Sequence, residues 1–503
     1  MEATVNSALY IGATGMKGLS EGMNVITNNL ANISTIGYKQ QSILFSDLIS
    51  TDQGGIGDWW GAQTDSYVAV GQTGKGLQVD TVRTLFNQGS FETSNTVTDL
   101  AINGKGFFQV TDGVNLYYTR AGDFRTYEDG VLRTPTGLAV NGYIYNADGT
   151  KGALQQVTLD KFGTMAAKAT SSVDLRCNLG LESQNSSSET DPYFSLIGQY
   201  NANSSPPIDS SAYGYSTGVT LYGADGSTQT ATIYYDAAPA DGADSVVQFL
   251  IASDKTTTDG TSATTGSGLL MSGTLTFNSS GQLTDMTAFT PSAENSVDLA
   301  DWQPAALSAG GLPQMTVDGQ TVTVNLGISA SGGWSNAPAS AADVGTDPAA
   351  LGGMNNAKVA SNATTNYTDS SSTTSVTSQN GYAAGTLNGI DIGSDGTITG
   401  SYSNGKSMDL WQIPICRFTS EDGLRREGNN LFSATPEAGQ MDMGVAGTEN
   451  YGTIEAYATE TSNVDMATEM VNMIITQRGF QSNSKVVTTA DEMLQKAMEL
   501  KRS

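Results

Sequence analysis

Apolar residues recur every seven positions at both extreme ends of this 503-residue chain. The N-terminal repeat and a second series offset by three comprise Leu9, Met16, Leu19, Met23, Ile26, Leu30 and Ile33. The C-terminal repeat comprises Met466, Met473, Phe480, Val487 and Leu494. This spacing is typical of a coiled coil and predicts helical arms over residues 1–33 and 462–503. The alternative is that each stripe covers a domain core, but the terminal positions favour arms.

The N-terminal arm carries four glycines inside its heptad pattern, at Gly12, Gly15, Gly18 and Gly22. Each glycine costs ~1 kcal/mol of helix stability relative to alanine, so together they weaken the arm by about 4 kcal/mol. We therefore expect this helix to form only when it packs against partners.

Between the arms the pattern changes to short alternating segments that indicate strands. Turn-forming dipeptides separate them, namely Asp129-Gly130, Asp148-Gly149, Asp225-Gly226, Asp318-Gly319 and Asn404-Gly405. The predicted fold class is therefore α+β and mainly β, with helical coiled-coil arms flanking nested β-rich domains.

Basic residues are scarce in the middle of the chain. Between Cys177 and Cys416 the only ones are Lys255, Lys358 and Lys406, which marks this segment as different from its flanks. We predict an inserted outer module over 181–377, as one β domain or as two that meet near 290–310, with its ends close together. A core domain would comprise 71–180 plus 378–450. Residues 34–70 and 451–461 would connect the parts.

Composition argues against several function classes. The chain has 50 acidic and 23 basic residues and a formal net charge of −27, which disfavours binding to nucleic acid or to anionic membrane surfaces. It contains no histidine, the commonest general base and metal ligand. We assign no catalytic, cofactor-binding or metal-binding residues and expect no enzyme and no cofactor. No apolar window of the ~18 residues that a membrane span needs is present, and no cleaved signal peptide is expected.

One nucleotide-binding pattern is present by letter only. Residues 400–407, GSYSNGKS, match the phosphate-loop pattern, but the surrounding sequence reads as strand, Asn404-Gly405 turn and strand instead of strand and helix. Acidic loops such as NADGT at 146–150 lack the calcium-ligand series. Trp59 and Trp60 could form a recognition surface, although paired aromatic residues more often serve as packing anchors.

Four ordered blocks carry a resemblance to a known family. They are NNLANISTIGYK at 28–39, DLAINGKGFFQV at 99–110 with the segment 117–143, NGYAAGTLNGIDIGSDGTITGSYSNGKS at 380–407, and the C-terminal segment 462–494. The chain resembles the rod and hook axial proteins of the bacterial flagellum. The first block is similar to the family signature through Asn28, Asn29, Leu30, Ala31, Asn32, Gly37, Tyr38 and Lys39.

Within that family, the chain resembles the hook subunits, which carry a long insertion, more than the shorter rod proteins. The resemblance implies a secreted structural protein that polymerises into a curved, flexible tube, the universal joint between rod and filament. The arms would line a central channel, and the insertion would form the outer layer. Implied partners are copies of itself, the distal rod protein, the hook cap, the hook–filament junction proteins and the flagellar type III export apparatus. The implied location is the extracellular hook.

Two alternatives and one modification remain open. A rod-like axial subunit is disfavoured by length, and a β-rich surface adhesin would place activity in 181–377. Cys177 resembles a cysteine that some hook proteins join to a lysine of an adjacent subunit, and Lys161 or Lys168 would be the partner here. The alternative for Cys177 is a small buried hydrophobic residue.

Overall fold

The computed structural model describes residues 2–48, 51–52, 72–146, 148–159, 163–254, 264–293, 295–448 and 450–502. The chain divides into two compact units. The terminal unit comprises Met1–Gly163 and Leu387–Ser503, and the inserted unit comprises Thr164–Thr386. Trp59 and Trp60 lie outside the described residues.

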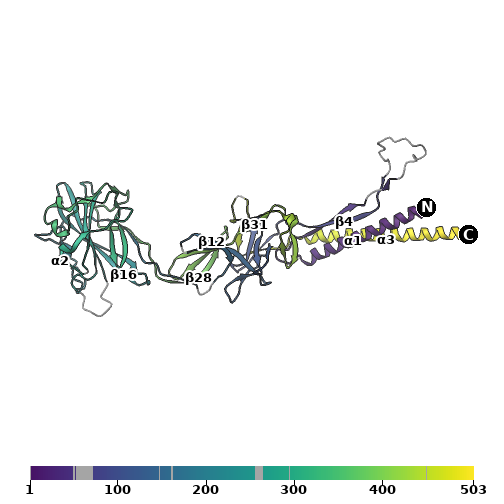
Figure 1. The fold of residues 1–503 in the computed structure, drawn as a ribbon, viewed down its shortest axis with the longest axis horizontal. Helices are drawn as coiled ribbons and strands as arrows, with labels where there is room; N and C mark the ends of the chain where they lie inside the picture. The colour runs from purple at the N-terminus through teal and green to yellow at the C-terminus, as the bar shows by residue number, and fades with distance from the viewer. Residues whose placement is uncertain are drawn as a thin grey trace, which may run out of the picture. The chain divides into compact units, whose positions relative to one another are not determined.

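The terminal unit contains two long helices, α1 (Glu2–Ala31) and α3 (Met466–Arg502), which run side by side (Figure 1). Its first strands are β1 (Gln41–Asp47), β2 (Thr51–Asp52), β3 (Gln72–Thr73), β4 (Leu77–Thr84), β5 (Phe91–Thr93), β6 (Leu100–Asn103), β7 (Phe108–Thr111), β8 (Leu116–Thr119), β9 (Arg125–Thr126), β10 (Leu132–Arg133), β11 (Ala139–Tyr145) and β12 (Lys151–Gln156). After the insertion come β28 (Gly385–Ile392), β29 (Thr397–Tyr402), β30 (Ser407–Gln412), β31 (Ile415–Phe418), β32 (Arg425–Gly428), β33 (Leu431–Ser433), β34 (Met441–Gly444), β35 (Thr453–Ala456) and β36 (Ala458–Glu460).

The strands of the terminal unit mix the two ends of the sequence. In the order β28-β29-β30-β11-β7-β8-β33-β32, the three strands β11, β7 and β8 from before the insertion lie between strands from after it. In addition, β35 pairs with β6 and β36 pairs with β5. Apolar side chains from both halves fill the core, including Leu100, Phe108, Ile398 and Ile454. A second apolar cluster, with Phe107, Phe418 and Phe432, also combines both halves, so the unit is discontinuous in sequence but its cores are shared.

All five predicted turn dipeptides close antiparallel hairpins. Their glycines have positive φ angles, for example +75° at Gly130 and +72° at Gly405. Such angles are strained for residues with a Cβ, which is why glycine marks these turns. Residues 400–407 therefore form the β29–β30 hairpin and not the strand-to-helix turn of a phosphate loop.

The inserted unit is built from two main sheets. One is the antiparallel meander β15 (Tyr215–Tyr222), β16 (Thr228–Asp241), β17 (Asp244–Ser253), β18 (Leu269–Phe277), β19 (Leu283–Pro291) and β20 (Trp302–Pro304). The other has the order β21 (Gln314–Val317), β22 (Gln320–Asn325), β14 (Ser172–Asn178) and β27 (Thr373–Gln379). The remaining elements are β13 (Thr164–Met165), α2 (Ser195–Gln199), β23 (Ile328–Ala330), β24 (Trp334–Ser335), β25 (Gly353–Met354) and β26 (Ala357–Val359).

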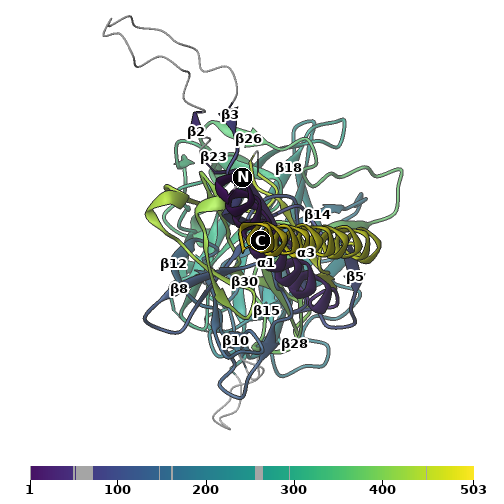
Figure 2. The same cartoon turned by 90° about the vertical axis from the view of Figure 1, so that its right-hand side faces the viewer.

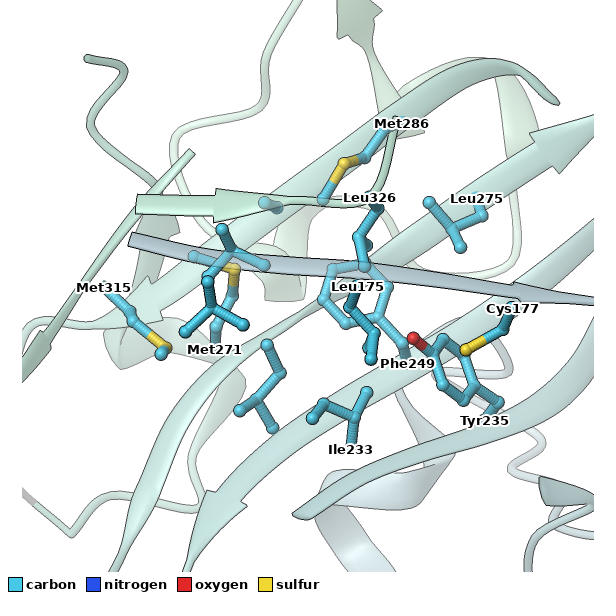
Figure 3. Close-up of a cluster of buried hydrophobic side chains, with 14 of the residues drawn as sticks. Leu175, Cys177, Ile233, Tyr235, Phe249, Met271, Leu275, Met286, Met315 and Leu326 are labelled. Atoms are coloured by element: carbon cyan, nitrogen blue, oxygen red, sulfur yellow. The ribbon is translucent and has the colours of Figure 1, made fainter. Parts of the chain in front are cut away.

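Apolar side chains are buried on both faces of the meander. On β17, Val247 and Phe249 belong to the core shared with β14 and β22, whereas Val246 and Leu250 face a second cluster with Trp302 and α2. Figure 3 shows the first of these cores. Burial on both faces explains the almost continuous apolar run of β17.

The boundaries of the inserted unit, Thr164 and Thr386, differ from those of the insertion predicted from composition, 181–377. The predicted insertion 181–377 falls inside the unit, which also includes β13 and β14. β19 pairs with β20, Pro291 opposite Trp302, so strands on both sides of this stretch belong to one sheet. The ends of the inserted unit itself lie together, because Thr164 pairs with Thr386, and β14 pairs antiparallel with β27.

Candidate functional site

The first two glycines of α1, Gly12 and Gly15, lie on the surface that packs against α3. A Cβ added at Gly12 would lie 2.7 Å from Val487 Cγ2, and one at Gly15 would lie 2.9 Å from Asn483 Nδ2. Gly479 of α3 lies in turn against Leu19. As residue numbers increase along α1, the numbers of the contacting residues on α3 decrease, so the two helices are antiparallel.

The next glycines of α1 face the β1–β4 hairpin. A Cβ at Gly18 would overlap Leu77 of β4, and one at Gly22 would lie 3.5 Å from Phe45 of β1. All four glycines are buried. The glycines that weaken α1 as an isolated helix therefore permit its close approach to two neighbours. Figure 2 shows α1 and α3 in contact from a second direction.

The heptad residues border this contact and are not deeply buried. The half-buried members are Leu9, Met16, Leu19, Met23, Ile26, Leu30, Ile33, Met473, Val487 and Leu494. Met466 and Phe480 are exposed, at 51% and 37%. Further exposed apolar side chains on α3 are Met470, Val471, Ile474, Ile475, Val486, Met493 and Met498. Within the described residues, α3 thus exposes apolar side chains along most of its length, most densely between Met466 and Ile475.

The signature segment turns the chain from α1 into β1, and Asn29 holds this turn. Its buried side chain donates to Gln41 O at 2.8 Å and accepts from Gln41 N at 2.9 Å. The same Oδ1 accepts from the Tyr38 hydroxyl at 3.2 Å. An amide can both donate and accept, which a carboxylate cannot do when ionised, so asparagine suits this position.

The other signature residues complete the turn. Asn32 Nδ2 donates to Asn28 O at 2.8 Å, while Ala31 is the exposed last residue of α1. Gly37 has φ +68°, and a Cβ there would lie within 2.8 Å of backbone atoms of Arg120 and Ala121. Glycine is required on both counts.

The start of α3 is tied to the same turn. The buried Glu469 accepts from Gln40 Nε2 at 2.7 Å and from Asn29 Nδ2 at 3.4 Å. Asn463 Oδ1 accepts from Gln40 N at 2.7 Å. The two chain ends are thereby joined by hydrogen bonds between residues more than 400 positions apart.

Lys39, Glu460 and Arg120 form a buried charged cluster beneath the helices. Lys39 Nζ lies 2.6 Å from Glu460 Oε1, and Arg120 Nη1 lies 3.3 Å from Glu460 Oε2, with the side chains at most 2% exposed. Glu460 also accepts from Gly89 N at 2.8 Å. Burial lowers the pKa of Lys39, and the neighbouring Glu460 carboxylate opposes that shift. The carboxylate therefore compensates the cost of burying two cations.

The sequence did not reveal Glu460, Arg120, Asn463 or Glu469 as members of this site. They lie far from the signature in sequence, and only the tertiary fold brings them to it. The block resemblance around 462–494 included two of them but gave no reason to select them. We call this set, with Asn29, Tyr38, Lys39 and Gln40, the arm junction.

Cys177 lies elsewhere, in the core of the inserted unit. It is 2% exposed, and Figure 3 shows its sulfur next to Tyr235. Its Sγ is 3.6 Å from Thr374 Oγ1, and burial raises the pKa of the thiol. Lys168 is described and pairs through its backbone with Tyr382, whereas Lys161 lies outside the described residues.

In the part of the chain that the structure describes, no group of three or more acidic or cysteine side chains is arranged to hold a metal ion. Neither α1 nor α3 contains a stretch apolar and long enough to cross a membrane.

Replacing Glu460 by glutamine should destabilise the terminal unit by about 3–5 kcal/mol, because two buried cations lose their counter-charge. Urea denaturation followed by circular dichroism measures this loss. The control is Glu427→Gln, which removes an exposed partner of Arg425 and should change the unfolding midpoint little. Equal midpoints for both variants would contradict the structural role of the buried cluster.

Models of four flagellar families match successive parts of the chain. The Flagella basal body rod protein model matches 9–39, and the Flagellar hook protein FlgE/F/G D1 domain model matches 101–167. The Flagellar basal body protein FlaE D2 domain model matches 185–382. The Flagellar basal body rod FlgEFG protein C-terminal model matches 455–500. The matches therefore include both helices and parts of both units.

Relatives align along nearly the full length. The flagellar hook protein FlgE of Borreliella burgdorferi is 29% identical, over 98% of this chain and 99% of its own. That of Escherichia coli is 28% identical, over 97% and 98%. The crystal structure of Helicobacter pylori FlgE2 covers 72% of this chain with a TM-score of 0.44 and 14% identity, too distant to support an argument. The order of the domain matches and the end-to-end alignments place this chain in the family of flagellar hook and basal-body rod proteins.

Proposed function

We propose that this chain is the structural subunit of a bacterial flagellar hook. Copies would polymerise into a curved, flexible tube that transmits torque from the rod to the filament. The observation that carries this proposal is the set of exposed apolar side chains on α3 that α1 does not cover, in a chain aligned end to end with hook proteins. A soluble monomer rarely exposes so extended an apolar surface unless a partner covers it.

The helical pair would form the inner layer of the tube. Side chains such as Ile474 and Ile475, at 49% and 62% exposure, would be covered by helices of neighbouring copies. The predicted assembly residues on both arms would act here, with the exposed Met466 and Phe480 in contact with other copies. Burial of apolar surface between copies would then stabilise the polymer.

The arm junction would pass load from the helices to the sheet. Glu460 ends β36, six residues before α3 begins, and binds Lys39 at the end of the signature. A force applied to either helix would thus act directly on a buried ion pair and on the hydrogen bonds of Asn29 and Glu469. The inserted unit would form the outer layer of the tube.

By resemblance, the partners beyond the chain itself would be the distal rod protein, the hook cap, the hook–filament junction proteins and the flagellar export apparatus. Export would proceed without a cleaved signal peptide, and the working location would be the hook outside the cell.

The apolar face of α3 predicts one assembly variant. Ile475→Asp should abolish tube formation while leaving the circular dichroism spectrum and unfolding midpoint of the monomer unchanged, because the side chain is 62% exposed. Gln477→Asp, also an exposed position of α3, adds the same charge and should assemble normally. Electron microscopy of both variants is the measurement. Normal tubes from Ile475→Asp would remove the helical face from the assembly contacts.

The two ends of the inserted unit pair with each other, Thr164 with Thr386, which predicts that the whole unit can be replaced. Joining Gly163 to Leu387 through a Gly/Ser linker should give subunits that still form tubes but without regular curvature, because outer contacts move most on bending. Electron microscopy with the full chain as control would show straight or irregular tubes. Loss of all polymer would place essential contacts in the removed segment.

A crosslink from Cys177 to a lysine of an adjacent copy remains a proposal. Because the thiol is buried, the strand around it would have to open first. If the crosslink forms, boiled polymers should show a ladder of bands in detergent with reductant, and Cys177→Ser should remove the ladder. Polymers of the unmodified chain that dissolve fully to monomer would exclude it.

A further inference from the structure

A polar recess of about 560 Å³ lies at one side of the terminal unit, between the end of β4, the turn before β7 and the segment after β31. Its charged lining residues are Arg83, Lys105, Arg417, Glu421 and Asp422. Among the residues that the structure describes, Arg83, Lys105 and Arg417 form no ion pair with a carboxylate. Arg417 instead lies over the Tyr451 ring, 5.8 Å from its centroid, with Asp442 opposite it on β34.

The charge behind the recess is also positive. Asn87 lines the recess, and its carbonyl oxygen accepts from Lys39 Nζ at 2.8 Å. The buried cluster to which Lys39 belongs has two cations and one carboxylate, as Glu460 faces both Lys39 and Arg120. Even with Glu421 and Asp422 in the lining, the recess and its floor therefore carry a surplus of positive charge, which favours an anionic group.

The β7–β8 turn is a protrusion with the complementary charge. Val114 at its tip is 89% exposed, and Leu116 beside it is 48% exposed. The Asp112 carboxylate accepts from the backbone N–H groups of Val114 at 2.8 Å and Asn115 at 2.6 Å. These bonds lower the pKa of Asp112 and keep the turn in one conformation, with the ionised carboxylate at the surface.

The recess and the protrusion lie at opposite ends of one strand. Lys105 precedes β7 (Phe108–Thr111), and Asp112 follows it. At ~3.3 Å per residue the two are separated by roughly 20 Å. When a surface and its complement lie on opposite sides of a subunit, successive copies bind head to tail. Such a contact builds an open helical polymer if the rotation between successive copies does not close a ring.

We propose that the β7–β8 turn of one copy docks into this recess of the next copy, with Asp112 placed against Lys105, Arg83 and Arg417. The contact rests on the proposed polymer but is separate from the helical contacts. It would set the direction of stacking between sheet domains, since a turn and a recess cannot be exchanged.

Charge reversal on each side of the contact tests the pairing with full-length chains. Asp112→Lys and Lys105→Glu should each raise the protein concentration needed for polymerisation about tenfold or more, because like charges then meet. An equimolar mixture of the two variants should polymerise near the concentration of the unmodified chain. In alternating copies, the introduced lysine of one variant would meet the introduced glutamate of the other, and the retained Asp112 would meet the retained Lys105. Rescue on mixing also shows that both variants fold.

The matched control is Asp148→Lys, which changes an exposed aspartate in the β11–β12 turn and should leave assembly unchanged. Assembly of Asp112→Lys at the normal concentration, or two defective variants that mixing does not rescue, would overturn this contact. Either result leaves the hook proposal standing as long as the unmodified chain forms tubes. Failure of the unmodified chain to polymerise would instead contradict the proposed function itself.

Discussion

The carboxylate of Glu460 is the constraint on which the terminal unit depends. It is shared between Lys39, which follows α1, and Arg120, which follows β8, and it lies six residues before α3. A buried ion pair seldom adds much net stability, but loss of one partner leaves an uncompensated charge. The cluster therefore specifies one arrangement of helices and strands, because displacement of any element would separate charges in an apolar surrounding.

Glycine has two opposite effects in α1, and the helix needs both. In isolation, the four glycines lower helix stability. In the folded unit, they let Val487, Asn483, Leu77 and Phe45 approach the helix backbone closely. The residues that make α1 dependent on its neighbours are thus the residues that fit it to them. What α1 does not cover is the far face of α3, and the apolar side chains there remain available for contacts between copies.

Local patterns predicted the elements of this fold well. The N-terminal arm was expected over 1–33, and α1 spans Glu2–Ala31. The Asp-Gly and Asn-Gly dipeptides marked true hairpins because a positive φ is a property of a single residue. The sequence analysis assigned the four glycines of α1 only a cost in helix stability, since heptad spacing identifies apolar residues but not which side of a helix permits the closest approach. Within the arm junction, the signature residues Asn29, Tyr38 and Lys39 were predicted, but their partner Glu460 was not, because it lies 421 positions from Lys39 and belongs to no periodic pattern.

The discontinuous sequence of the terminal unit has a consequence for the order of folding. Its core needs strands from both sides of the insertion, so it cannot close before the C-terminal segment is available. The inserted unit is continuous, and its β14–β27 pairing holds together two chain segments that are separated by about 200 residues in sequence. Its prior folding would shorten the effective loop by more than tenfold and remove roughly 2–3 kcal/mol of loop-closure entropy from the later step. Folding of the insertion would thus favour later folding of the domain that contains it, independently of the surface that the insertion presents in the assembled polymer.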